Sequence, residues 1–165
     1  MTSVPAHADL VTVNGLPLHP LVVHATVVTL PVTAVLALLY VYRANTGSRL
    51  KPREDGRLRL ALLVLAIVCA ALVWLTRFSG FQLRDALGMS APVVHNHEVW
   101  ADRLAWATYA FAVVAVVVSF RDQRADWMRG LLHALLVVAA VGVVVLCGFA
   151  GDAGAQLVYG GVSSR

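Results

Sequence analysis

Histidine residues gather at two points of this sequence, each at the start of a long apolar stretch. His19 and His24 open the first stretch, and His95 and His97 open the third. Imidazole nitrogen atoms bind transition metals and the iron of haem. If the two stretches cross a membrane in the same direction, all four imidazoles lie at one end of the molecule, at the edge of the hydrocarbon. Polar side chains are costly there, so the cluster indicates a function.

Apolar stretches dominate the chain of 165 residues, of which 59% are hydrophobic and 13% are charged. A spanning helix needs about 20 apolar residues, and four stretches approach or exceed that length. We therefore expect an all-α fold, a four-helix transmembrane bundle that forms a single integral membrane domain over residues 1–165. The helices are expected at about residues 20–43, 58–77, 97–120 and 129–150.

Basic residues indicate the orientation of the bundle, because cytoplasmic loops retain Lys and Arg during insertion. Nine of the 13 basic residues fall within residues 43–59 or 121–129. We expect both termini on the outer side of a bacterial plasma membrane. The basic segments have no interleaved aromatic side chains, so anionic lipid headgroups are the expected partner and nucleic acid is not.

The ends of the helices carry further signals. Pro20 suits the first position of a helix, with His19 as its cap. Asn14 and Gly15 predict a turn before it. Residues 77–96 form the longest connection, about twenty residues, and a loop of that length usually has a function or a helix of its own. Asn96 is expected to cap the third helix. No internal repeat is visible in the residue identities.

A haem site is the first hypothesis for the histidine cluster. His24 and His97 are expected at nearly the same depth on two helices, as two axial ligands of one iron require. Small residues follow His97 at helical spacing, and they leave room for a flat macrocycle or for close packing without a cofactor. These residues are Ala101, Ala105, Thr108 and Ala112.

Charged residues on the same side have two interpretations each. Arg77, Arg84 and Arg103 are placed to pair with haem propionates, or they anchor helix ends among lipid headgroups. Asp102 and Asp152 are placed to orient a ligand histidine through its second nitrogen atom, or they solvate the helix ends. His133 is the only histidine at the other end of the bundle, and we expect it to be structural.

A metal site without haem uses the same residues. His19, His24 and His97, with Asp102 or Asp152, provide three or four ligands for a Cu, Zn or Fe ion. His95 and His97 differ by two residues, which rotates a helix by about 200°, so only one of them points into a shared site. A cofactor-free accessory subunit, with interfacial histidines bonded to carbonyl groups and water, is the third interpretation. The residues alone leave all three open.

Several segments resemble a family of four-helix bacterial integral membrane proteins with a Leu-His-Pro-x-x-x-His signature, here residues 18–24. The actinobacterial branch is also similar at residues 79–83, 97–102 and 151–160. Members resemble b-type cytochromes in arrangement, and some are joined to Rieske iron–sulfur domains. The resemblance implies electron transfer near the quinone pool.

This chain has no Rieske ligands of its own, and it has Ala25 and Thr26 where many relatives have Phe-Pro. A redox partner, whether a quinone, a Rieske protein or a cytochrome, is therefore expected to be a separate molecule. Taken together, the sequence predicts a haem-binding electron-transfer subunit with one b-type haem near the outer face, ligated by His24 and His97. Enzymatic activity is not predicted in either direction.

Overall fold

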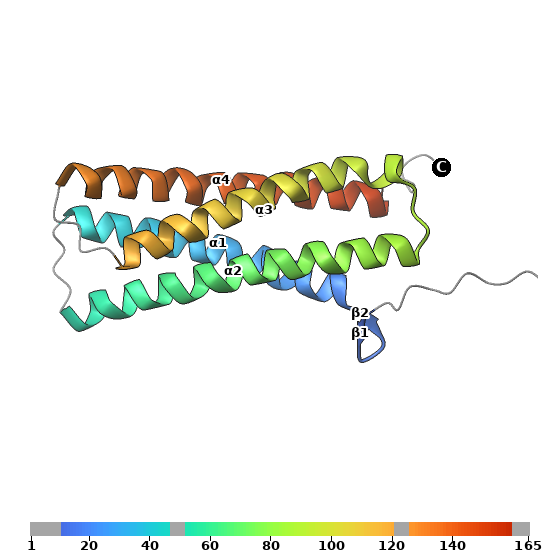
Figure 1. Cartoon of the computed structure of the whole chain (residues 1–165), viewed down its shortest axis with the longest axis horizontal. Coiled ribbons are helices and arrows are strands. Elements are labelled where there is room, and N and C mark those ends of the chain that lie inside the picture. Colours follow the sequence, from blue (N-terminus) through green and yellow to red (C-terminus); the bar gives the residue numbers. More distant parts are fainter. Residues whose placement is uncertain (1–10, 47–51, 121–125, 160–165) are drawn as a thin grey trace, which may run out of the picture.

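Four long helices form an antiparallel bundle in the computed structural model, which describes residues 11–46, 52–120 and 126–159 (Figure 1). Each helix packs on its neighbours in the sequence, and the first also packs on the last, so the bundle is closed. All four are long and apolar enough to cross a membrane, which confirms the predicted all-α architecture. The helices are α1 (Leu18–Thr46), α2 (Pro52–Ala86), α3 (Ala91–Phe120) and α4 (Asp126–Tyr159).

A short β-hairpin precedes α1 at the end of the bundle where α4 finishes (Figure 1). Its strands are β1 (Thr12–Val13) and β2 (Leu16–Pro17). Asn14 and Gly15 join them with φ angles of 51° and 79°, as a tight hairpin turn requires, so the predicted turn is confirmed. The helix begins at Leu18 and not at Pro20, so His19 lies inside the first turn instead of capping it.

The helices α2 and α3 are longer than their apolar stretches. Only residues 87–90 connect them, where the sequence suggested a connection of about twenty residues. Asn96, the expected cap, lies inside α3. Ion pairs between α2 and α3 explain why both helices continue beyond their apolar stretches, because charged side chains there have partners of opposite charge on the other helix. Arg77 is 2.8 Å from Asp102, and Arg84 is 2.9 Å from Glu98.

The buried residues of the first two helices recur at equivalent positions of the last two helices. Those of α1 from residue 26 onwards have buried counterparts in α3 that lie 78 residues later. The described buried residues of α2 have buried counterparts in α4 that lie 74 residues later. The pairs in α1 and α3 are Thr26/Leu104, Leu30/Thr108, Thr33/Phe111, Ala34/Ala112, Ala37/Ala115 and Val41/Ser119; those in α2 and α4 are Leu62/Leu136, Ala66/Ala140, Cys69/Val143, Val73/Cys147 and Ser79/Ala153.

This shared register relates the hairpin α1–α2 to the hairpin α3–α4. In a closed antiparallel bundle, α1 and α3 run in the same direction on opposite sides of the core, and so do α2 and α4. The register therefore relates one hairpin to the other by an approximate twofold rotation about an axis along the bundle, which we call the pseudo-twofold axis, as in membrane proteins built from parallel repeats. The structure thus reveals a repeat that the sequence analysis did not detect. Cys69 and Cys147 are both buried and free, as expected of cysteines that pack as small hydrophobic residues.

Candidate functional site

His19 lies in the first turn of α1 and its ring packs against α2. Its Nδ1 atom is 3.1 Å from the carbonyl oxygen of Thr76 and 3.2 Å from Oγ of Ser79. A carbonyl oxygen only accepts, so Nδ1 carries the proton and Nε2 keeps its lone pair. The ring lies on Gly80, where an added Cβ atom would come within 3.1 Å of Cε1. The helix α2 thus supplies a hydrogen-bond acceptor for the imidazole and, at Gly80, the space that its ring occupies.

His97 has the same environment in the other hairpin. Its Nδ1 atom donates to the carbonyl oxygen of Ala150 at 3.2 Å. An added Cβ atom at Gly154 would come within 3.2 Å of its Cε1 atom. The acceptor and the glycine are four residues apart on α4, as Thr76 and Gly80 are on α2. His97, Ala150 and Gly154 therefore occupy the positions that the pseudo-twofold axis assigns to His19, Thr76 and Gly80.

His19 and His97 lie on opposite sides of the bundle at the same end, which we call the paired-histidine end. Within residues 11–46, 52–120 and 126–159, no hydrogen bond engages Nε2 of either ring. This end of the bundle thus carries two imidazoles that are held through Nδ1 and have no described partner at Nε2.

His24, which the haem hypothesis pairs with His97, lies at the surface of α1. The side chain is exposed, and its Nδ1 atom is 2.6 Å from the carbonyl oxygen of Pro20 in the same helix. Five residues separate it from His19, which rotates the helix by about 140°, so the two rings cannot share a direction. Its counterpart across the pseudo-twofold axis is Asp102, which is also exposed.

The remaining predicted ligands do not join the pair. His95 is exposed two residues before His97. Asp152 is exposed and accepts a hydrogen bond from Gln156 at 2.8 Å. Among the described residues, no group of three or more His, Cys, Asp or Glu side chains is placed to hold a metal ion. His133 is buried at the opposite end, where the sequence placed it.

The predicted arginines lie near the paired-histidine end, and protein groups engage all three. Arg77 and Arg84 form the ion pairs that join α2 to α3. Arg103 places its guanidinium carbon 4.6 Å from the centre of the Trp100 ring. Of the three, only Arg103 has no carboxylate partner within the described part of the chain.

Gly80 and Gly154 contact the two histidine rings, and sequence reasoning did not connect them with the histidines. The carbonyl groups of Thr76 and Ala150 were also missed, because any residue supplies a backbone acceptor. One signal was available: Gly, Gln and Leu recur with the same spacing at residues 80, 82 and 83 and at residues 154, 156 and 157. Comparing these segments would have aligned α2 with α4 and hence His19 with His97.

Comparison with known proteins supports the membrane assignment. The chain belongs to the family of predicted membrane proteins DUF2231, which matches residues 15–163. The matched region includes His19 and His97 and the glycines that contact them. No similarity to a curated protein or to a solved structure was found.

Proposed function

We propose that this member of the DUF2231 family binds one b-type haem at the paired-histidine end and transfers electrons in a bacterial plasma membrane. His19 and His97 would hold the haem iron, and His19 replaces His24 in the pair expected from the sequence. The observation that carries the proposal is the matched pair of imidazoles with fixed Nδ1 atoms and available Nε2 atoms. Ligand histidines usually donate their second N–H group to a carbonyl or carboxylate in this way.

The number of ligands favours haem over a bare metal ion. A porphyrin supplies four nitrogen atoms to its iron, so the protein needs to add only two. Zinc and copper sites usually take three or four protein ligands, and no group of three converges among the described residues. A Cu, Zn or Fe ion at the same histidines is therefore the second candidate, and it needs ligands from water or a partner.

The residues around the pair are small. Ala105 and Thr108, two of the small residues that follow His97 at helical spacing, are fully buried. Ser79 and Ala153 are buried at corresponding positions of α2 and α4. When bound, a haem with two histidine ligands supplies reversible one-electron transfer.

The protein's own groups then have distinct tasks. Thr76 and Ala150 hold the two imidazoles in the tautomer that would bind iron through Nε2, and the glycines leave space for each ring beside its helix. Arg103 is the arginine available to a propionate, because Arg77 and Arg84 already face carboxylates. Electrons are exchanged with a separate quinol, Rieske protein or cytochrome.

We expect one haem per chain in a pyridine haemochrome assay. The opposite end of the bundle has one imidazole among the described residues, His133, and its Nδ1 atom bonds to Asn45 at 3.2 Å. A second haem with two histidine ligands therefore lacks a partner ligand there. A ratio of about two haems per chain would contradict the single pair of ligands.

Cysteine labelling tests the proposed orientation in the membrane. Ser90→Cys, in the connection between α2 and α3, is expected to react with an impermeant thiol reagent added to intact cells. Thr46→Cys, at the end of α1, is expected to react only after lysis, because positive residues gather at that end. Both positions are exposed. Wild-type protein is the control, since Cys69 and Cys147 are buried. The reverse labelling pattern would invert the orientation.

A further inference from the structure

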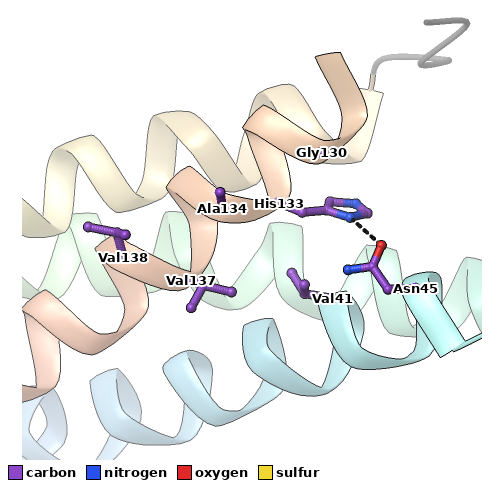
Figure 2. A pocket seen from close by; sticks show the side chains of 7 residues that line it. All are labelled: Val41, Asn45, Gly130, His133, Ala134, Val137 and Val138. Atoms are coloured by element: carbon purple, nitrogen blue, oxygen red, sulfur yellow. Dashed lines mark hydrogen bonds between the residues drawn. The ribbon is translucent and has the colours of Figure 1, made fainter. Parts of the chain in front are cut away.

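Two cavities lie at the end of the bundle opposite the paired histidines, and the pseudo-twofold axis relates them. One, the α1–α4 groove, has a volume of about 390 Å³ and is lined by Val41, Asn45, Gly130, His133, Ala134, Val137 and Val138 (Figure 2). The other, the α2–α3 groove, has a volume of about 230 Å³ and is lined by Gly56, Arg59, Leu60, Leu63 and Ser119. Each residue of the α2–α3 groove has its counterpart in the α1–α4 groove.

The two grooves differ in their polar groups. In the α2–α3 groove, the Arg59 guanidinium donates a hydrogen bond to the carbonyl oxygen of Ser119 and brings a charge into the cavity. The counterpart of Arg59 is His133, which is only 3% exposed. Its Nδ1 atom donates to Oδ1 of Asn45 at 3.2 Å (Figure 2). The edge of the ring also meets Tyr40, with the ring centres 5.9 Å apart. The α1–α4 groove thus has a neutral polar pair where the other groove has a cation.

His133 and Asn45 together have an unused hydrogen-bond acceptor and an unused hydrogen-bond donor. Because His133 donates from Nδ1, its Nε2 atom is an acceptor, and the amide nitrogen of Asn45 is a donor. Neither atom has a further hydrogen bond within the part of the chain that the structure describes. A hydroxyl group donates and accepts at once, so it complements the pair. None of the residues that line this groove is a carboxylate, a lysine or an arginine.

The rest of the groove suits an apolar body. Valine and alanine side chains form its walls, and Val138 at its edge is 69% exposed on the surface that faces lipid in a spanning bundle. Pockets for small organic ligands usually measure about 300–1,000 Å³. The α1–α4 groove falls in this range, and the α2–α3 groove falls below it.

We propose that the α1–α4 groove binds the hydroxylated ring of an isoprenoid quinol. One ring hydroxyl donates to Nε2 of His133 and accepts from the amide nitrogen of Asn45, while the isoprenoid tail passes over Val138 into the lipid. The proposal concerns binding alone and is independent of the haem at the other end.

Blocking the mouth of the groove provides the test. The full-length protein in detergent is titrated with a decyl-tailed benzoquinol by isothermal calorimetry. Wild-type protein is expected to bind one equivalent, and Val138→Trp is expected to weaken binding by about tenfold or more. Val64→Trp is the matched control, because Val64 is the counterpart of Val138 and is also exposed to the surroundings of the bundle. It is expected to change the affinity by less than about twofold.

A second variant tests the hydrogen bonds. Asn45→Leu removes the donor at an exposed position near the end of α1 and is expected to weaken binding by about tenfold. His19→Ala is expected to bind the quinol as the wild type does, which separates this site from the haem site. Undiminished binding to Val138→Trp, equal losses in both tryptophan variants, or complete displacement of the quinol by phosphatidylglycerol would each overturn the proposal.

Discussion

His19→Ala and His97→Ala are each expected to abolish the low-spin haem spectrum of the purified protein. Each substitution removes one of the two imidazoles proposed as ligands, and a haem with one histidine ligand left is five-coordinate or dissociates. The measurement is the visible spectrum of the oxidised and the dithionite-reduced protein at equal protein concentration. Because the two sites are equivalent under the pseudo-twofold axis, we expect equal losses.

His24→Ala is the matched control for these variants. The His24 side chain is exposed and bonded within its own helix, so its loss is expected to leave the spectrum unchanged. Added imidazole, which can occupy the vacated position, is expected to restore the low-spin spectrum of His19→Ala. That recovery separates loss of a ligand from loss of the fold. A wild-type spectrum in His19→Ala, together with loss of haem in His24→Ala, would establish the pair predicted from the sequence instead.

Gly80→Leu and Gly154→Leu are expected to lower the affinity for haem by about 10–100-fold. A leucine at either position crowds a histidine ring, because even a Cβ atom would lie 3.1 Å from His19 or 3.2 Å from His97. The ring then loses the carbonyl group that fixes its tautomer. Haem titration of the apoprotein measures the affinity.

Gly151→Leu is the control for the glycine prediction. It lies on the same helix as Gly154, and no atom lies within 4 Å of the Cβ position there. Its haem affinity is expected to match that of the wild type. An equal loss in Gly151→Leu and Gly154→Leu would show that leucine harms α4 in general and that Gly154 has no special role.

Hydropathy and charge predicted the number of helices and the level of the histidines, because both depend on residue type along the chain. They did not predict which face each histidine occupies. His19 and His24 are separated by little depth but by about 140° of rotation, and only the packing of α1 on its neighbours distinguishes them. The ends of α2 and α3 were misjudged because Arg84 and Glu98 stabilise helix beyond the apolar stretch only when they meet.

The repeat escaped notice because equivalent positions of the two hairpins are both buried but often differ in residue type and size. Leu30 corresponds to Thr108, and Thr33 corresponds to Phe111, so a large residue in one hairpin corresponds to a smaller one in the other. A core requires its total volume to be filled and does not require identical residues at equivalent positions. The hydrogen-bond acceptors of His19 and His97 could not be predicted either, because they are backbone carbonyl groups, which every residue has.

Electron paramagnetic resonance of the oxidised, full-length protein, purified from cells supplied with haem, tests the central claim most directly. Two histidine ligands hold ferric haem in the low-spin state, so we expect a low-spin signal that integrates to about one iron per chain. That signal is expected to disappear in both His19→Ala and His97→Ala. Protein that contains no haem iron, or haem whose low-spin signal survives the loss of either histidine, would contradict the account.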